Sequence, residues 1–319
     1  MKKTNKKTLN VDVRDEKIIN EELYVGMIVS DADITNQYGL SMLYNTRTEN
    51  SNYTDIFDNV LEGKPSVIIR YENNYITKGK EKDILILEED FLSVFANDKA
   101  PILIKNKENG FKGFMSFIIP DYRKEEYDLA IGAITSDEPI IIIQEVKTGC
   151  IAIVNAYHSY LLDGIISRTI EKMKEIAIKR TEEKLEFNAV VMPHRRRIDI
   201  PTTYDHKLDI YLSNYLNNVN IKKIYNKGNN GIRIYLSVID AILSELQKYM
   251  SIENITICKG AIGDRNLKGE LLYGSKIEAK RDNAYLQLSY NSDNTLSNET
   301  RNMLRRNIMK RNMVFLRKL

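Results

Sequence analysis

Short runs of Ile, Val and Leu, separated by polar turns, recur along the first half of the chain. These runs are too short and too rich in β-branched residues for helices, which favours buried strands. The strands predicted in this way span residues 65–70, 83–88, 129–134, 139–144 and 150–154. Residues 101–119 alternate Ile, Leu and Phe with Lys, Asn and Gly around Asn109-Gly110, and this pattern predicts a hairpin.

The spacing of apolar residues changes to three and four after residue 160. It predicts an amphipathic helix over residues 161–180. A second helix is expected from Ser237 to Met250, because Ser237 followed by Asp240 resembles a capping box. A strand at residues 254–258 follows it. Near the end of the chain Leu304, Ile308 and Phe315 could share one helical face.

This order of elements predicts one compact α/β domain. No internal repeat and no long linker interrupts the chain, and its 6 prolines give no sign of a Pro-rich hinge. We expect a domain over residues 21–290, preceded by a basic segment at 1–20 and followed by a basic tail at 291–319.

Composition predicts a cytoplasmic protein. A chain of 319 residues with 43% hydrophobic residues can bury a core of ordinary size. It has no apolar run of about 18 residues that could span a membrane, and its beginning lacks the apolar segment of a secretory signal. The 2 cysteines, Cys150 and Cys258, form no CxxC pair and lie in predicted strands, so we expect buried thiols.

The net charge of +3 combines basic ends with an acidic body. Residues 1–7 carry 4 basic residues and residues 301–319 carry 7, neither with an acid, which leaves −8 for residues 8–300. The basic C-terminal segment could be a helix docked on the acidic body or a contact for nucleic acid or another anionic partner. A segment without fixed structure is the third interpretation.

A pattern found in magnesium-dependent nucleases flanks two of the predicted strands. Asp128 precedes the strand at 129–134, and Glu145-Val146-Lys147 lies at the end of the Ile-rich strand at 139–144, which matches the loose pattern D…ExK. Paired carboxylates there would hold Mg²⁺, and the lysine would position or activate water. The same residues also suit a polar turn between two apolar strands, and this structural interpretation competes with the nuclease.

The central block of the chain resembles that of the bacterial laccase-domain family. Thr135-Ser136-Asp137-Glu138-Pro139 corresponds to the family motif T-A-D-C-x-P, and the turn at residues 145–149 to its D-P-x-T-G. Asn155-Ala156-Tyr157-His158-Ser159-Tyr160, followed by a helix, corresponds to H-A-G-W-R-G. Residues 38–45 and 70–76 are similar to the family's N-terminal segment and to its Q-V-H-G motif. The resemblance covers most of residues 25–290 in order and spacing.

The resemblance implies a fold and an activity. The fold would be a single layered α/β domain in which mixed β-sheets are covered by helices. Family members are described as multicopper polyphenol oxidoreductases and as zinc-dependent purine nucleoside phosphorylases, which also act on adenosine as deaminases. The implied substrates are therefore a purine nucleoside and phosphate.

The metal-binding positions of the family are changed in this chain. The His, Cys and His ligands are replaced by Glu72, Glu138 and Asn155. The resemblance implies zinc or copper, but zinc favours imidazole and thiolate and is not expected here, whereas oxygen donors suit Mg²⁺ or Mn²⁺. Without a metal, Glu72 and Glu138 could serve as an acid/base pair or remain as solvated carboxylates. In an active protein we expect Asn155 and Asn45 to orient the substrate.

Two further residues are candidates for binding. His158 could replace the lost imidazole if the loop shifts. Arg195, in the segment Met192-Pro193-His194-Arg195-Arg196-Arg197, could bind phosphate, although an exposed basic loop is the simpler interpretation.

Three functions remain open from the sequence. The first is a laccase-domain enzyme of altered or lost purine nucleoside phosphorylase or deaminase activity. The second is a non-catalytic binding or regulatory protein on the same fold. The third is the magnesium-dependent nuclease of Asp128, Glu145 and Lys147.

Overall fold

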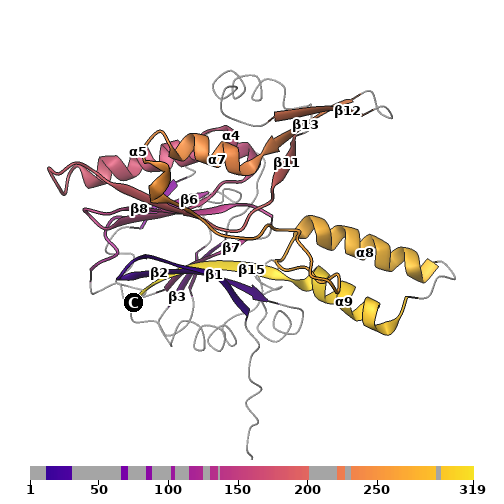
Figure 1. Cartoon of the computed structure of the whole chain (residues 1–319). Coiled ribbons are helices and arrows are strands. Elements are labelled where there is room, and N and C mark those ends of the chain that lie inside the picture. Colours follow the sequence, from indigo (N-terminus) through magenta and orange to yellow (C-terminus); the bar gives the residue numbers. More distant parts are fainter. Residues whose placement is uncertain are drawn as a thin grey trace, which may run out of the picture.

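The computed structural model consists of two large β-sheets that pack face to face, with helices outside one of them (Figure 1). It describes residues 12–30, 66–70, 84–87, 102–104, 115–124, 130–135, 137–200, 221–226, 231–291 and 296–319. Both large sheets have 6 strands and contain parallel and antiparallel pairs. The predicted layered α/β fold with mixed sheets is confirmed.

The first sheet contains both the beginning and the end of the described chain. Its strand order is β1 (Asp12–Asn20), β2 (Leu23–Ser30), β15 (Arg311–Lys318), β7 (Ala130–Thr135), β3 (Ser66–Arg70) and β5 (Ile102–Ile104). β15 lies inside the sheet, antiparallel to β2 on one side and to β7 on the other. β3 runs parallel to its neighbours β7 and β5.

The second sheet carries the central block of the sequence. Its strand order is β14 (Ile255–Ile257), β10 (Phe187–Val191), β8 (Ile140–Glu145), β9 (Cys150–Asn155), β6 (Ser116–Ile119) and β4 (Ile84–Ile86). Every residue of β8 and β9 is buried, because one face packs on helices and the other on the first sheet. Coverage of both faces explains why these strands read as continuous Ile-rich runs.

Helices cover the outer face of the second sheet. α5 (Ile165–Ala177) and α7 (Val238–Leu246) place their apolar sides in the core cluster that contains Ile141 and Val154. The short α4 (His158–Leu162) precedes α5, and the 3₁₀ turn η5 (Ile252–Asn254) precedes β14. A small third sheet has the order β11 (Arg197–Ile200), β13 (Gly231–Ser237), β12 (Ile221–Asn226).

A pair of helices projects from the edge of this body. α8 (Lys276–Asn291) and α9 (Asn298–Met309) lie side by side on the right of Figure 1 and connect directly to β15. Among the described residues, no helix has the length and apolar character needed to cross a membrane.

Most predicted elements are present, with small shifts at their ends. The strands expected between residues 65 and 154 are found as β3, β4, β7, β8 and β9. Ser237 caps α7 by accepting a hydrogen bond from the Asp240 amide, as the capping-box pattern predicts. The helix expected at 161–180 is divided, because Gly164 adopts a left-handed conformation with φ of 72° between α4 and α5.

Two predictions about elements are wrong. Residues 101–119 do not pair as a hairpin, because β5 and β6 belong to different sheets. Leu304 is buried in α9, but Phe315 lies in β15 and cannot share a helical face with it. Residues 298–318 thus supply a helix and an internal strand to the folded body.

Candidate functional site

Three residues predicted from the family motifs lie at the same end of the central strands β8 and β9 of the second sheet. Glu138 lies just before β8 and Asn155 is the last residue of β9. The two strands are antiparallel, and Ile140 is paired with Asn155. His158 begins α4 shortly after β9 ends. We call Glu138, Asn155 and His158 the site edge.

Asn155 is a buried amide at the end of β9. The residue is 2% exposed, and its backbone N–H donates to the Met115 carbonyl at 2.7 Å. Its strand partner Ile140 belongs to the core between the two sheets, so the Asn155 side chain is on the same inner face. Among the described residues, the buried side-chain Oδ1 has no hydrogen-bond partner, a state it shares with Oε1 of Gln144 on β8. A buried acceptor in this state costs about 1–3 kcal/mol, so its presence calls for an explanation.

Glu138 and His158 add a carboxylate and an imidazole to the site edge. The Glu138 carbonyl accepts from Thr135 Oγ1 at 2.9 Å, and its Oε2 accepts from the Asp137 amide at 3.1 Å. The His158 ring lies 4.1 Å from that of Tyr157. Burial lowers the pKa of His158, and the negative charge of Glu138 raises it to a smaller extent. The imidazole is therefore mainly neutral at pH 7 and can accept a proton.

Asp137 and Arg195 connect the site edge to α8. Asp137 accepts from Ser275 Oγ at 2.5 Å and from the Ile277 amide at 3.0 Å, which places its carboxylate at the beginning of α8. Arg195 Nε lies 3.4 Å from Asp137 Oδ1, and Arg195 Nη2 lies 3.1 Å from Glu278 Oε1. Burial raises the pKa of Asp137, whereas the hydrogen bond from Ser275 and the charge of Arg195 lower it.

Arg195 is thus held between two carboxylates beside the site edge. Its binding of phosphate stays a prediction. The sequence analysis gives Asp137 no role, although its position directly before Glu138 marks it as a possible neighbour of the site. Its contacts come from Ser275, 138 positions away in the chain, which no local pattern reveals.

The basic segment that contains Arg195 is only partly exposed. His194 is 7% exposed, and its Nδ1 lies 3.1 Å from the Met192 carbonyl. The interpretation of an exposed loop is therefore wrong for His194, although Arg196 and Arg197 are exposed. Burial lowers the pKa of His194.

Several predicted residues cannot be placed. Glu72, Asn45 and Asp128 lie outside the described residues. Their predicted roles therefore remain predictions.

Glu145 of the nuclease pattern is a structural residue of the β8–β9 turn. It is 0% exposed. Its carboxylate accepts from Thr148 N at 2.7 Å and Thr148 Oγ1 at 2.5 Å, and from Lys147 N and Glu186 N at 3.1 Å each. These four donors occupy the oxygens that a metal would need.

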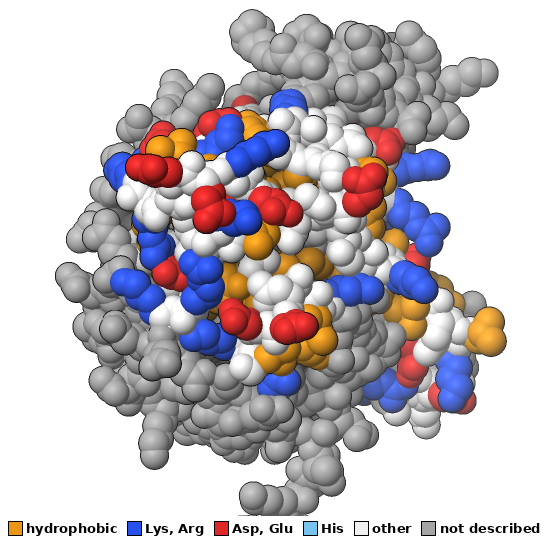
Figure 2. Space-filling view, turned by 60° about the vertical axis from the view of Figure 1, so that its left-hand side comes forward, with side chains coloured by type: hydrophobic (Ala, Val, Ile, Leu, Met, Phe, Trp, Pro, Cys, Tyr) orange, Lys and Arg blue, Asp and Glu red, His pale blue; other side chains and the backbone are white. Residues whose placement is uncertain are grey.

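Lys147 lies at the surface of the same turn. Its ammonium is 3.4 Å from Glu183. Figure 2, which brings forward the side of the molecule with this turn, shows acidic and basic side chains interleaved. Because the Glu145 carboxylate is satisfied by donors of the turn and of Glu186, the turn interpretation explains Glu145 and Lys147 better than the nuclease does.

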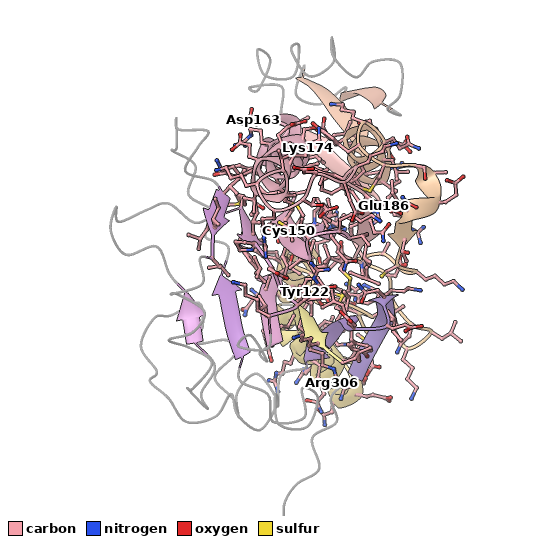
Figure 3. The ribbon with its side chains drawn as sticks, turned by 90° about the vertical axis from the view of Figure 1, so that its left-hand side faces the viewer. Tyr122, Cys150, Asp163, Lys174, Glu186 and Arg306 are labelled. Atoms are coloured by element: carbon pink, nitrogen blue, oxygen red, sulfur yellow. The ribbon has the colours of Figure 1, made fainter. Side chains whose placement is uncertain are left out.

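Both thiols are buried, as the sequence predicted. Cys150 lies in the interior of the molecule (Figure 3), and its pKa is raised to about 12, mainly by burial and to a smaller extent by the charge of Glu145. Because the thiolate is the reactive form, we expect the native protein to react with a thiol reagent at pH 8 only through unfolding. Titration with such a reagent checks this, since 2 thiols should appear only in denaturant. Fast reaction of the native protein would contradict the buried placement.

Comparisons with known proteins identify the class of fold. No protein-family model and no curated protein matches the chain. Its structure is similar to that of the Neisseria meningitidis protein NMB0706, at 9% sequence identity over 97% of this chain and 99% of that chain, with a TM-score of 0.51. NMB0706 is described by the family model DUF152, and the similarity confirms the layered α/β fold that the central block predicted.

Two further solved structures match over most of the chain. The Bacillus licheniformis protein YfiH is 10% identical, with 92% of each chain covered and a TM-score of 0.47. YlmD from Geobacillus stearothermophilus is 10% identical, with 95% of this chain and 94% of that chain covered and a TM-score of 0.47.

Proposed function

We propose that the chain is a divergent laccase-domain protein that binds a purine nucleoside at the site edge, with the phosphorylase and deaminase activity of the family altered or lost. The unpartnered, buried Oδ1 of Asn155 is the observation that carries this proposal. The laccase-type fold supports it, because the strand ends that hold Glu138 and Asn155 correspond to metal-binding motifs in the family.

The residues of the site edge do not fit the zinc or copper of the family. Glu138 and Asn155 stand in for Cys and His, and they offer oxygen donors where zinc and copper favour nitrogen and sulfur. Within the part of the chain that the structure describes, no group of three His, Cys, Asp or Glu residues is arranged to hold a metal ion. Mg²⁺ or Mn²⁺ would suit the oxygen donors better.

The site edge is suited to hydrogen bonding with a nucleoside. Asn155 Oδ1 can accept from an amino group, a ring N–H or a ribose hydroxyl, and such a bond would satisfy the buried acceptor. A site that hydrogen-bonds its ligand rejects analogues that lack the donor. The neutral imidazole of His158 can take a proton from a ligand hydroxyl or from water, and the Glu138 carboxylate beside it would stabilise the resulting charge.

Asn155→Leu should make the unliganded protein more stable. Leucine has nearly the shape of asparagine and removes a buried acceptor that no donor satisfies, so the free energy of unfolding should rise by about 1–2 kcal/mol. Urea denaturation measures the change. Asn312→Leu is the matched control, because Asn312 is 1% exposed but exchanges hydrogen bonds of 2.6 and 2.7 Å with the Gly274 backbone. The control should destabilise by about 2–4 kcal/mol, and equal losses for both variants would contradict the account of Asn155.

An activity assay decides between altered and lost catalysis. Purified protein is incubated with adenosine or inosine and phosphate, with Zn²⁺, Mg²⁺, Mn²⁺ or a chelator, and products are separated by chromatography. Altered activity predicts a base or deaminated product that depends on Glu138, with no requirement for zinc. Glu138→Gln is the comparison, because it keeps the size and removes the charge.

Binding without any product identifies the non-catalytic protein on the same fold. Neither binding nor product would contradict the proposal as a whole. Incubation with DNA and Mg²⁺ tests the nuclease. No cleavage is expected, because the Glu145 carboxylate already accepts hydrogen bonds from Thr148 within the β8–β9 turn.

A further inference from the structure

The buried side of α8 is mainly polar, and its exposed side carries several apolar residues. On the buried side, Glu278, Asp282 and Ser289 are only 9%, 6% and 7% exposed, beside Leu286 at 6%. On the other side, the apolar residues Ile277, Tyr285 and Leu288 are 40%, 52% and 65% exposed. A surface helix normally turns its apolar side inward. The outward apolar side therefore needs an explanation of its own.

Ion pairs and hydrogen bonds hold α8 in this orientation. Arg265 Nη2 lies 2.8 Å from Asp282 Oδ1 and 3.4 Å from Glu278 Oε2. Asn307 Nδ2 of α9 donates to Asp282 Oδ2 at 2.9 Å, and Asp137 accepts from the Ile277 amide at the beginning of the helix. Because the buried polar side is satisfied in this way, rotation of α8 to hide its apolar side would break these contacts.

The helical period defines one continuous surface on the exposed side. Residues spaced by three, four and seven positions share a helix face. The residues that follow Ile277 at these spacings along α8 are all exposed. We call this set the α8 outer face: Ile277, Lys280, Arg281, Ala284, Tyr285 and Leu288. It contains two basic residues and no acid, and the Arg281 side chain is 70% exposed although it also pairs with Glu278.

Neighbouring residues extend the positive charge. Lys276 is exposed at the start of α8, and Arg305 is exposed on the adjacent α9, where it donates to Tyr290 Oη at 3.1 Å. Arg306 is also exposed, but it is paired with Glu270 at 2.6 Å. An occupant of the α8 outer face must therefore be anionic as well as apolar. A second copy of this chain does not fit, because self-association of this face would bring Lys280 and Arg281 close to the same charges.

Size and chemistry separate the anionic candidates. A stable protein interface buries about 800 Å² per partner and involves roughly 20–30 residues a side, far more than the α8 outer face offers. Nucleic acid would contact the basic residues but would leave Ile277 and Leu288 without a role. A lipid surface needs no complementary shape and uses apolar, basic and tyrosine side chains together.

We propose that the α8 outer face is a peripheral docking site for a membrane surface rich in anionic lipids. Ile277, Ala284 and Leu288 enter the boundary between headgroups and acyl chains, and Tyr285 lies at headgroup depth. Lys280 and Arg281 reach the lipid phosphates and carboxylates. The projection of α8 and α9 from the edge of the body, seen in Figure 1, places this face at the periphery of the described structure. The proposal is independent of the function of the site edge.

Vesicle sedimentation with the full chain tests the proposal. Vesicles of phosphatidylcholine alone are compared with vesicles that contain about 30% phosphatidylserine, at about 0.1 M and about 0.5 M NaCl. Binding is expected to the anionic vesicles and to weaken at high salt. Ile277→Ser with Leu288→Ser should lower the partition coefficient at least about tenfold, and Lys280→Gln should lower it about fivefold.

Matched variants test whether vesicle binding is specific to the α8 outer face or is a nonspecific effect of exposed apolar residues. Ile178 and Ile257 are 66% and 40% exposed on other elements, so Ile178→Ser with Ile257→Ser should leave binding unchanged. Circular dichroism checks that every variant keeps its fold. The proposal is overturned by equal binding to neutral vesicles, by no binding at all, or by anionic binding that the Ile277 and Leu288 changes leave intact. Binding to a DNA or RNA oligonucleotide with no binding to vesicles also overturns it.

Discussion

Removal of residues 311–319 is expected to abolish folding of the whole chain. β15 is paired with β2 from Arg311 to Lys318 and with β7 over Asn312–Leu316, so its loss divides the first sheet. Met313, Val314, Phe315 and Leu316 are each at most 3% exposed. Burial of four such side chains contributes about 6–12 kcal/mol, which is comparable with the entire stability of a typical domain, about 5–15 kcal/mol. Solubility, circular dichroism and the loss of a cooperative thermal transition measure the outcome.

A charge variant distinguishes a strand from a basic tail. Arg305→Gln removes one charge from an exposed position of α9 and keeps the strand, so we expect the free energy of unfolding to change by less than about 1 kcal/mol. If the truncated protein kept a cooperative transition close to that of the full chain, the internal position of β15 would be contradicted. If the truncated protein is unfolded, as expected, a loss of binding on deletion of this segment reports loss of the fold.

Glu145→Ala is expected to lower the free energy of unfolding by about 3–5 kcal/mol. The substitution leaves two hydrogen-bond donors of Thr148 and the amides of Lys147 and Glu186 without their acceptor, in a turn where the carboxylate is 0% exposed. Hydrogen bonds to a charged acceptor contribute more than neutral ones. Urea denaturation with a two-state analysis gives the change.

Lys147→Ala is the matched control within the same turn. Its ion pair with Glu183 is exposed on both sides, so the loss should be less than about 1 kcal/mol. A nuclease with these residues at its centre would behave in the opposite way. It would lose Mg²⁺-dependent cleavage with either substitution, and stability would change little.

The fold is predictable from the sequence where the cause is local. β8 and β9 follow from apolar runs that are buried on both faces, and the start of α7 follows from the Ser237 cap. Strand pairing depends on residues far apart in the chain, so β5 and β6 looked like one hairpin although they belong to different sheets. β15 was missed for a related reason: Asn312–Leu316 are all buried, and a strand covered on both faces shows no alternation.

The candidate site is also predictable only in part from the sequence. The order of the motifs predicts that Glu138, Asn155 and His158 lie in one region, and the antiparallel pairing of β8 with β9 places them at the same end of these strands. The missing partner of Asn155 Oδ1 depends on three-dimensional packing and has no sequence signal. The contacts of Asp137 and Arg195 with α8 likewise join segments that are more than 80 positions apart.

Calorimetric titration of adenosine and inosine into the native protein and its Asn155→Leu variant tests most directly whether Asn155 Oδ1, a buried acceptor that costs stability in the unliganded protein, binds a purine nucleoside. We expect saturable binding to the native protein and a loss of affinity of at least about tenfold in the variant, because a buried hydrogen bond to the ligand is removed. Equal affinity of the two proteins, or no binding by the native protein, would contradict this role of Asn155.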